Sequence, residues 1–473
     1  MGVNIYSIVS IVVIAINIVF IITAVFFERK KPVQALSWLL ILFFLPLVGF
    51  FLYLLFGRRS YKQYSHKVFK NYDDIPYGKS VTAENINDEM KQLLRLNAAT
   101  SFSPLTDDNS VEIFTDAHEK YEALIRDIEG AKSSVHMLYF IIQNDYIGKK
   151  IIELLAKKAK EGLEVRVLFD HGSNLLMPFR AYKSIVENGG EVSSYFSNTL
   201  GNYLKVNFRN HRKIVVIDGT IGYVGGINIG DEYLGLKEKV SPWRDTHLRI
   251  TGSSVVDLQL RFIEDWIYAS RQDVTLFDKN RYFPETADIY KGNTGIQMVS
   301  SGPDTNGEEI KRGLIKMINS AKKNIYIQTP YFVPDTPFLE ALQNAALSGI
   351  EVIIQIPGKP DKWYVYKATM SFVADVIGYG VKIYLYPGFL HAKMTVVDDF
   401  CSVVGTANVD MRSFALNFEI DAFMYGHEIT QRCTKIFNDD LKVSTLLTKE
   451  KYESRSVLSK IGEDVIRLFS PIL

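Results

Sequence analysis

The sequence predicts an α/β protein in which two similar lobes, with mixed and largely parallel sheets, follow two transmembrane helices. Three observations predict this class: two long uncharged segments near the amino terminus, an internal repeat in the remainder, and helical stretches that alternate with β-branched runs. At 473 residues, 47% of them hydrophobic, the chain can bury more than one core. We expect a membrane hairpin over 1–60, a linker with a short helix over 61–110, and lobes over 111–285 and 286–473.

The two uncharged segments are long enough to cross a membrane. Residues 3–27 and 33–57 contain no charged side chain and are rich in Ile, Val, Leu and Phe. At about 1.5 Å per helical residue, either segment spans a hydrocarbon core of roughly 30 Å. A cleaved signal peptide fits poorly, because the first segment is too long and a second one follows directly. We therefore expect a multi-pass protein of the cell membrane with two spans.

Charge distribution bears on sidedness and on partners. Basic clusters lie in the loop between the segments (29–31) and after the second segment (58–62), so the positive-inside rule pulls both ways. We favour the second cluster, which places the catalytic body on the cytoplasmic side.

Residues 1–60 carry five basic side chains and one acidic, a net of +4, whereas the other 413 residues carry 49 basic and 52 acidic, a net of −3. A slightly acidic body lacks the footprint of a nucleic-acid binder, so we expect no nucleic-acid partner.

The body after the linker contains one unit twice. Three pairs of segments share a pattern at offsets of 190, 187 and 190 residues: 131–137 with 321–327, 161–165 with 348–352, and 189–192 with 379–382. Each copy alternates amphipathic stretches with short β-branched runs, three times over. This alternation predicts right-handed crossovers and helices that cover the sheets. Two similar lobes that face each other would place a site at their interface.

The strongest signal stands at the end of each copy. Both copies fit the pattern H-x-K-x(4)-D, followed after six residues by a small pair, one spacer and Asn, at an offset of 180 residues. The candidate catalytic residues are His211, Lys213 and Asp218 in the first copy and His391, Lys393 and Asp398 in the second. The candidate phosphate-binding residues are Asn228 and Asn408. A doubled pattern inside an internal repeat is far more specific than a lone histidine in a strand.

The spacing within the motif points to an anionic ligand. The β-branched run that begins after Lys213 predicts a strand, so His211 and Lys213 point to the same face. An imidazole beside an ammonium is costly to bury unless an anion lies between them. Asp218 begins an Asp-Gly turn and lies an odd number of positions from both residues, so we expect it, like Asp398, to support the turn. Two imidazoles, two cations and two amides around one point suit a phosphodiester.

A metal site is the competing interpretation of the histidines. It would need His, Cys or carboxylate ligands that converge, whereas each motif histidine has a lysine neighbour that would repel a cation. The two cysteines, Cys401 and Cys433, match no zinc-ligand spacing and cannot build a disulfide framework. We expect neither a metal nor a cofactor.

Two carboxylates downstream of the motifs are candidates for orienting the histidines. An attacking imidazole needs its second ring nitrogen held by a hydrogen-bond acceptor. Asp245 lies 34 residues after His211, and Glu419 lies 28 residues after His391. Both precede a short stretch with alternating apolar residues, so they occupy matching places in the repeat. The alternative is that they are ordinary carboxylates at the edge of a strand.

The doubled H-x-K-x(4)-D pattern resembles the phospholipase D superfamily. The amino-terminal hairpin narrows the resemblance to bacterial cardiolipin synthases through five of its residues: Trp38, Pro46, Gly49, Tyr53 and Gly57. The resemblance covers nearly the whole chain and implies a phospholipase D-like duplication of the fold. One departure is Thr406, where many second copies have Ser, and a hydroxyl is retained.

The resemblance implies a chemistry for the motif residues. In this superfamily, one motif histidine attacks phosphorus to form a phosphohistidine, and the other protonates the leaving alcohol. By analogy with the family, we favour His211 as the nucleophile and His391 as the acid and base. The motif lysines and asparagines would hold the non-bridging oxygens, which requires no metal.

The resemblance also implies an activity. We expect a phosphatidyltransferase that joins two phosphatidylglycerol molecules and releases glycerol, with the lipid bilayer as a partner. The nearest alternative is a phospholipase D or another phosphatidyl transferase with a different alcohol preference. Alternatives of other classes are a membrane-tethered nuclease and a catalytically idle scaffold. An oligomer is compatible with the sequence, which does not indicate its state.

Overall fold

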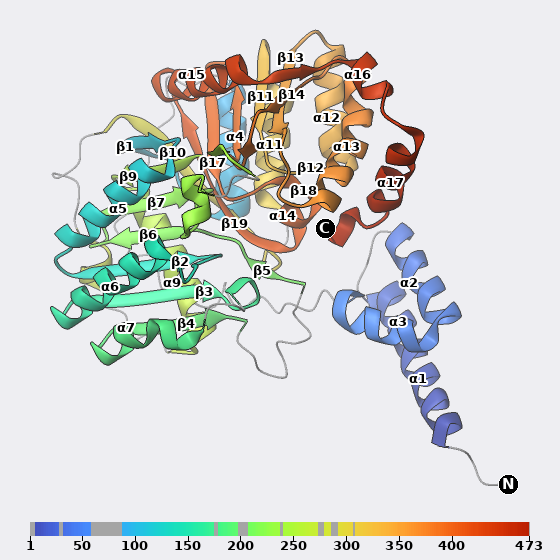
Figure 1. Cartoon of the computed structure of the whole chain (residues 1–473), viewed down its shortest axis with the longest axis horizontal. Helices are drawn as coiled ribbons and strands as arrows, with labels where there is room; N and C mark the ends of the chain where they lie inside the picture. The colour runs from blue at the N-terminus through green and yellow to red at the C-terminus, as the bar shows by residue number, and fades with distance from the viewer. Residues whose placement is uncertain are drawn as a thin grey trace. The chain divides into compact units, whose positions relative to one another are not determined.

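The computed structural model describes residues 5–27, 32–57, 88–174, 178–196, 207–236, 240–272, 279–284, 292–305 and 308–472. The chain forms two compact units, one of residues 1–62 and 196–208 and one of residues 63–195 and 209–473. The small unit holds the apolar amino-terminal helices, and the large unit holds the repeat (Figure 1). Of the linker predicted over 61–110, residues 61–87 lie outside the described ranges.

The small unit is built from apolar helices. Its segments are α1 (Ile5–Ile22), a π-helical turn (Thr23–Phe27), α2 (Pro32–Phe44), α3 (Pro46–Leu52) and a second π-helical turn (Tyr53–Gly57). Because Pro46 has no N–H, it ends α2 and leaves the Leu42 carbonyl without its helical donor. The Asn17 amide donates to that carbonyl at 3.4 Å and to the Pro46 carbonyl at 2.8 Å. Across the described ranges, no helix combines the length and the apolar character needed to cross a membrane.

The large unit is organised around one mixed sheet that runs through both copies of the repeat. In the described part of the chain this sheet has sixteen strands, in the order β20-β14-β13-β11-β16-β17-β19-β10-β1-β9-β7-β6-β2-β3-β4, with β5 paired to β19. The two copies join where β1 pairs with β10 in antiparallel fashion. Two-stranded sheets, β12 with β18 and β15 with β8, stand beside it.

The first part of the large unit contains the helix of the linker and the first copy. Its elements are α4 (Asp88–Ser101), β1 (Thr106–Phe114), α5 (Ala117–Gly130), β2 (Ser134–Tyr139), α6 (Tyr146–Lys160), β3 (Glu164–Asp170), η5 (Gly172–Asn174), η6 (Phe179–Tyr182), α7 (Lys183–Glu187), β4 (Glu191–Tyr195), β5 (Arg209–Asn210), β6 (Ile214–Ile217), β7 (Ile221–Gly225), η7 (Asp231–Leu234), β8 (Trp243–Arg244), β9 (His247–Thr251), α9 (Val255–Ser270) and α10 (Lys279–Tyr282).

The second part contains the second copy and the carboxyl-terminal helices. Its elements are β10 (Thr294–Ser301), α11 (Glu309–Ser320), β11 (Asn324–Gln328), β12 (Phe332–Val333), α12 (Thr336–Leu347), β13 (Glu351–Pro357), α13 (Trp363–Ile377), β14 (Lys382–Tyr386), β15 (Phe389–Leu390), β16 (Met394–Val397), β17 (Cys401–Gly405), β18 (Val409–Asp410), α14 (Met411–Ala415), β19 (Asn417–Tyr425), α15 (His427–Val443), β20 (Thr445–Leu447), α16 (Lys449–Glu453), α17 (Val457–Arg467) and η9 (Ser470–Ile472).

The helix–strand alternation of each copy is as the sequence predicts. The order α5-β2-α6-β3-α7-β4 recurs as α11-β11-α12-β13-α13-β14, with the short β12 inserted. The second helix of each copy ends before a glycine in the left-handed region, Gly162 at φ +92° and Gly349 at φ +86°. A side chain there would strain the backbone, so these glycines stop the helix and start the next strand.

The prediction of largely parallel sheets is wrong. Parallel pairing in the central sheet is found within β2-β3-β4, within β11-β13-β14 and between β5 and β19, and the other described neighbours are antiparallel. Parallel neighbours need a crossover helix, and each copy has such helices only in its first half. The motif strand and its return are joined by a tight turn, which makes β6-β7 and β16-β17 antiparallel hairpins.

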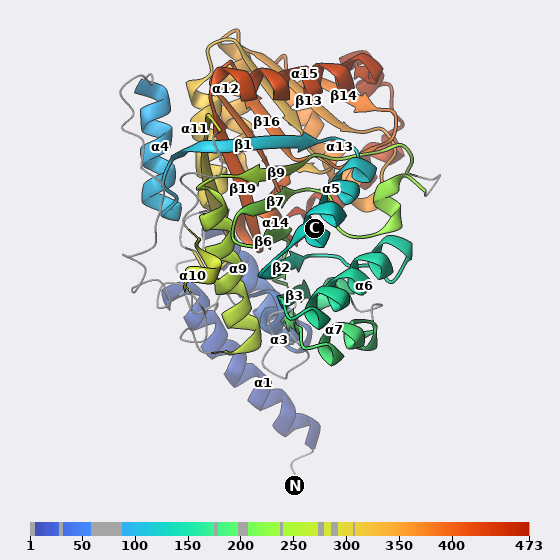
Figure 2. The same ribbon diagram turned by 90° about the vertical axis from the view of Figure 1, so that its left-hand side faces the viewer.

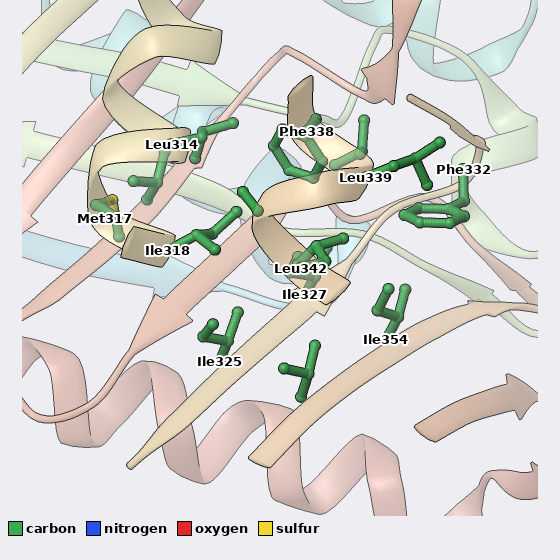
Figure 3. Close-up of a cluster of buried hydrophobic side chains, with 14 of the residues drawn as sticks. Leu314, Met317, Ile318, Ile325, Ile327, Phe332, Phe338, Leu339, Leu342 and Ile354 are labelled. Carbon is green, nitrogen blue, oxygen red and sulfur yellow. The ribbon is translucent and has the colours of Figure 1, made fainter. Parts of the chain in front are cut away.

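Helices cover both faces of the sheet in each copy. In the first copy, His136 of β2 stacks on Phe262 of α9 at 4.9 Å between ring centroids, whereas α5, α6 and α7 cover the other face (Figures 1 and 2). In the second copy, Tyr326 of β11 stacks on Phe437 of α15 at 4.7 Å. The alternate residues of β11 point into the opposite layer, toward α11 and α12 (Figure 3). The two copies are therefore three-layered in the same way.

The core of the second copy shows how tightly these layers pack. Figure 3 shows helix side chains that meet strand side chains. Those of the helices are Leu314, Met317 and Ile318 of α11 and Phe338 and Leu342 of α12, and those of the strands are Ile325 and Ile327 of β11 and Ile354 of β13. Ile325, Ile327 and Ile354 are fully buried. At about 25 cal/mol per Å² of apolar surface, each buried isoleucine contributes roughly 1.5–3 kcal/mol. Such packing fixes β11, the strand that pairs with β16, and β16 is flanked by the motif residues Lys393 and Asp398.

Candidate active site

Each motif histidine follows a two-residue strand that pairs with a strand from the other copy. β5 pairs in parallel with β19, and the His211 amide donates to the Phe418 carbonyl at 3.0 Å. β15 pairs in parallel with β8, and the His391 amide donates to the Arg244 carbonyl at 2.6 Å. The two arrangements are equivalent, because in each the histidine comes from one copy and the partner strand from the other. Both copies therefore contribute to one composite site.

Each histidine ring is held by a carboxylate of the other copy. His211 Nδ1 lies 2.9 Å from Glu419 Oε2 and 3.1 Å from the Thr406 carbonyl oxygen. His391 Nδ1 lies 2.6 Å from Asp245 Oδ2. Along the sequence, Asp245 follows His211 and Glu419 follows His391. In the structure the pairs are crossed, because Glu419 binds His211 and Asp245 binds His391. A proton on Nδ1 is donated to the carboxylate, which leaves the lone pair of Nε2 for chemistry.

Each motif lysine bonds to the backbone of the histidine two residues before it, and both residues lie between strands and not within one. Lys213 Nζ donates to the backbone carbonyl of His211 at 2.7 Å, and Lys393 Nζ donates to the backbone carbonyl of His391. Lys213 is fully buried, and its ammonium lies 5.3 Å from the centroid of the Phe140 ring. Each ammonium is thus fixed next to the histidine of its own motif.

Burial and charge shift the pKa values of both lysines. The pKa of Lys213 is lowered to about 7, mainly because the side chain is buried, while the charge of Glu419 opposes the shift and that of Lys393 adds to it. Burial lowers the pKa of Lys393 to about 8, against the opposing carboxylates of Asp245 and Glu419. Groups of both copies therefore act on each lysine within one electrostatic environment. An anion bound between the ammonium groups would offset the cost of burying them.

The histidines and their carboxylates differ in charge. Burial lowers the pKa of His391 to about 4 and lowers that of His211 well below its usual range, with motif lysines adding to both shifts. Burial raises the pKa of Glu419 to about 7. Burial also acts to raise the pKa of Asp245, but the charges of His391 and Lys393 hold it below its ordinary value. At pH 7, both rings are neutral and Asp245 is fully ionised, whereas Glu419 is partly protonated.

The motif aspartates lie at the far ends of their strands. Asp218 accepts hydrogen bonds at 2.7–2.9 Å from three successive backbone amides that end with the first residue of β2, and Asp398 does the same at the start of β11. Both residues have positive φ angles, +52° and +49°, as in tight turns. They tie the motif hairpin to the neighbouring strand. The structure therefore separates them from the histidines and lysines with which the motif groups them.

The two motif asparagines have different surroundings. The Asn228 side chain accepts from the Ile141 amide at 3.2 Å and donates to the Tyr233 hydroxyl at 2.8 Å, and it is 2% exposed. Asn408 is 6% exposed, and its Oδ1 has no hydrogen-bond partner among the described residues. Asn228 is therefore engaged in the protein framework, whereas Asn408, two residues after Thr406, retains an unsatisfied polar atom.

Aromatic rings around the histidines were missed by the sequence analysis. Trp243, Phe389 and Tyr233 lie 5.3, 5.5 and 6.3 Å from His391 between ring centroids, and Phe140 lies 4.6 Å from His211. Trp243 and Phe389 stand two residues before Asp245 and His391, so strand alternation could have placed them on the site's face. Phe140 and Tyr233 give no such signal. These rings supply the low-dielectric surroundings that shift the pKa values.

Within the described ranges, the structure contains no group of three or more His, Cys, Asp or Glu side chains arranged to hold a metal ion. The acids and histidines of the site are instead arranged as two separate hydrogen-bonded pairs. Each pair has a lysine beside it.

Comparison with family models gives two matches. Residues 124–241 and 314–441 match the model described as "Cardiolipin synthase, PLD-like domain", which covers both copies of the repeat. Residues 15–58 match the model described as "Phospholipase_D-nuclease N-terminal". The matched ranges include both motif histidines and most of the apolar hairpin.

Comparison with curated proteins gives relatives of nearly equal length. The chain is 44% identical to the major cardiolipin synthase ClsA of Bacillus subtilis (strain 168), with 97% of each chain covered. It is 44% identical to a cardiolipin synthase of Staphylococcus aureus (strain Mu50), over 97% of this chain and 95% of the relative. Among solved structures, phosphatidylserine synthase from Haemophilus influenzae matches with a TM-score of 0.61 at 16% identity, covering 82% of this chain and 100% of that one. That likeness shows a shared fold.

Proposed function

Because the chain belongs to the cardiolipin synthase family of phospholipase D-like proteins, we propose that it transfers a phosphatidyl group from one phosphatidylglycerol to another, giving cardiolipin and glycerol. The observation that carries the proposal is the pair of histidines that stand in equivalent places, each held at Nδ1 by a carboxylate. A diester exchange in two displacements needs a nucleophile and an acid on opposite sides of phosphorus.

In the first displacement, Nε2 of His211 attacks the phosphorus of phosphatidylglycerol. The bond from phosphorus to the glycerol oxygen breaks, and His391 donates a proton to that oxygen. This ring is neutral in the free protein at pH 7, and the negative charges of the bound phosphate and of Asp245 stabilise the protonated form that the step requires. Glycerol leaves, and the phosphatidyl group remains on His211. In the second displacement, neutral His391 removes a proton from a hydroxyl of the second phosphatidylglycerol. That oxygen attacks phosphorus, the phosphorus–nitrogen bond breaks, and His211 is restored.

The assignment of the two histidines is supported by their carboxylates. Asp245 has a pKa below its ordinary value, so an ionised carboxylate stands beside His391 and stabilises its imidazolium form. Glu419, with a pKa of about 7, gives weaker support to a charged His211. A nucleophile must be neutral and an acid must carry a proton. We therefore assign attack to His211 and proton transfer to His391.

The motif lysines would hold the non-bridging oxygens of the phosphate. Both ammonium groups are buried beside a histidine, and each is raised in energy by the other. A phosphodiester would relieve that repulsion, and the phosphorane would relieve it more, because its charge is greater. The unsatisfied Oδ1 of Asn408 is an acceptor, so it suits a hydroxyl group of the substrate and not a phosphate oxygen, whereas the Asn228 side chain is already bonded to Ile141 and Tyr233.

The amino-terminal hairpin would hold the enzyme at its lipid substrate. We base this on the uncharged segments over 3–27 and 33–57, each of which is long enough for one span. The basic residues after the second segment favour a catalytic body on the cytoplasmic side. The division of the body into lobes over 111–285 and 286–473 stays a prediction.

The product of purified full-length protein tests the proposal. Vesicles that contain phosphatidylglycerol labelled in the acyl chain should give cardiolipin as the main product. His211→Ala should abolish the product, whereas His118→Ala, on the exposed surface of α5, should retain it. Phosphatidic acid as the sole product would contradict the proposed transfer and indicate hydrolysis.

A further inference from the structure

A buried arginine binds the backbone of each residue whose carboxylate orients a histidine. Arg212 Nε donates to the Glu419 carbonyl at 3.2 Å, and Arg244 Nη1 donates to the Asp245 carbonyl. The exposed fractions of the two arginines are 0% and 6%. The backbone that carries each orienting carboxylate is thus held by a fixed cation.

Each arginine is bound in turn by an aspartate, and the two aspartates come from equivalent helices, α9 and α15. Asp265 of α9 accepts two hydrogen bonds from Arg212 Nη1, at 2.7 and 2.8 Å. Asp440 of α15 accepts one from Arg244 Nε at 3.1 Å and lies 2.8 Å from Arg244 Nη2. The two helices occupy equivalent places, because α9 follows β9 after Asp245 and α15 follows β19 with Glu419. Each acts on the carboxylate of the other copy, since Asp265 of α9 holds the arginine bound to Glu419 and Asp440 of α15 holds the arginine bound to Asp245. Two chains of contacts therefore run from helix to arginine to carboxylate to histidine, and each crosses between the copies.

The two arginines come from opposite strands of equivalent strand pairs. In the pair β5 and β19, the arginine is Arg212, directly after the motif histidine, and Phe418 stands before the carboxylate. In the pair β15 and β8, the arginine is Arg244, directly before the carboxylate, and Ala392 follows the motif histidine. Two different sequence solutions thus supply the same contact. This points to the contact itself, and not to one ancestral residue, as the feature that the site requires.

Fold stability alone gives a weak reason for these contacts. A buried ion pair seldom makes a protein more stable than a well-packed apolar replacement would. The planar guanidinium does provide direction, because its donors are fixed relative to one another. A group that must be oriented within a fraction of an ångström benefits from such a support.

We propose that these two arginine–aspartate pairs are positioning pairs that orient the carboxylates and, through them, the two motif histidines. The pairs are Arg212–Asp265, acting on Glu419, and Arg244–Asp440, acting on Asp245. The inference rests on the proposed function, since catalysis by the histidines is what the pairs serve. Their loss affects turnover, while substrate binding at the lysines stays close to normal.

Two conservative variants test the pairs in the full-length protein in phosphatidylglycerol vesicles. Asp265→Asn and Asp440→Asn should each lower kcat about 10- to 100-fold and change KM less than twofold, because misplacement of a catalytic group by about 1 Å costs rate on this scale. The matched control is Asp127→Asn, which removes one carboxylate from another partly buried pair, with Arg249 Nε at 2.6 Å. This control should keep kcat within twofold.

Moving the arginine to the partner strand distinguishes a positioning role from a merely structural one, because only a positioning role predicts that activity returns. Arg212→Ala should lose activity. The double variant Arg212→Ala with Phe418→Arg should be at least tenfold more active than Arg212→Ala, because it places the arginine directly before the carboxylate, as Arg244 stands before Asp245. Thermal unfolding of each variant measures whether it is folded. A folded double variant no more active than Arg212→Ala would overturn the proposal.

The outcome for the aspartates is equally decisive. If Asp265→Asn and Asp440→Asn lose no more kcat than Asp127→Asn, or only as much as their folded fraction falls, the pairs are structural and the proposal is wrong. Total phosphatidylglycerol consumed is the quantity measured. A product other than cardiolipin would therefore contradict the proposed function while leaving the comparison of variants valid.

Discussion

At the scale of the residue, the two motif histidines differ in the carboxylate that holds each ring. Asp245 binds His391 at 2.6 Å and has a lowered pKa, whereas Glu419 binds His211 at 2.9 Å and has a pKa raised by burial to about 7. The near-symmetry of the sequence motifs hides this difference. It gives His391 the better-stabilised charged form, which supports the proposed assignment of His391 as the acid and His211 as the nucleophile.

A substrate with an activated leaving group separates the two roles. An analogue of the phospholipid with p-nitrophenol as its headgroup needs no proton on departure, so its first displacement requires the nucleophile alone. We expect His391→Ala and Asp245→Asn to retain a burst of p-nitrophenol of about one equivalent. His211→Ala should give no burst. A burst from His211→Ala, with none from His391→Ala, would reverse the assignment.

The lysines predict a pH dependence. A lysine is protonated below its pKa, and the free enzyme has pKa values of about 7 for Lys213 and about 8 for Lys393. Binding of the phosphate needs the charged forms, so kcat/KM for phosphatidylglycerol should fall as pH rises through 7 to 8, by up to about tenfold per pH unit for each group. The measurement is kcat/KM between pH 6 and 9.5. In Lys213→Arg the decline should move to higher pH, and an unchanged decline would remove Lys213 from this role.

At the scale of the element, strand ends and turns carry the site. Gly226 follows β7, and a Cβ placed on it would lie 1.9 Å from Asp245 Oδ1. The equivalent position in the second copy is Thr406, whose hydroxyl bonds to the Ile420 backbone while the longer Glu419 reaches His211. The small residue of the first copy thus makes room for the shorter carboxylate.

Enlarging that glycine should disturb catalysis. Gly226→Ala is expected to displace the Asp245 carboxylate from His391 and to lower kcat by about 100-fold. Gly130→Ala, near the end of α5, meets no atom within 4 Å and should leave activity unchanged. Steady-state kinetics and thermal unfolding of both variants make the comparison. Full activity in Gly226→Ala would show that the close approach is unimportant for orienting Asp245.

Much of the arrangement of helices, strands and turns could be predicted from the sequence. The alternation of helices and strands and the turn at Asp218 follow from local patterns, and the structure has them. The motif strand begins later than predicted, because His211 and Lys213 lie between β5 and β6 and not within a strand. The share of parallel pairing was overestimated, because β-branched runs do not indicate whether a helix or a tight turn connects them. The crossed carboxylates could not be predicted, since the spacing between His211 and Asp245 along the chain says nothing about which copy lies across the interface.

At the scale of the whole molecule, one sheet joins both copies through β1 and β10. The family predicted from the doubled motif is confirmed by the match over both copies and by relatives with 97% coverage. The continuous sheet holds the copies in the register at which β5 meets β19 and β15 meets β8. Catalytic geometry therefore depends on how the copies join, and not on either copy alone.

Energetic coupling should follow the crossed pairs. Double-mutant cycles on unfolding free energy should give about 0.5–3 kcal/mol for His211 with Glu419 and for His391 with Asp245, because these residues are in direct contact. The same-copy combination of His211 with Asp245 should give about 0.5 kcal/mol or less. The substitutions are His→Ala, Glu→Gln and Asp→Asn, measured by reversible unfolding in detergent. Larger coupling within a copy than between copies would contradict the crossed arrangement.

The exchange of carboxylates also has a consequence for the origin of the chain. A polypeptide with a single copy would complete its histidine–carboxylate pairs only by associating with a second, identical polypeptide about a twofold axis. Gene duplication and fusion of such a homodimer would yield the present topology. Fusion also releases the halves from exact symmetry, so that one side can use aspartate and glycine where the other uses glutamate and threonine.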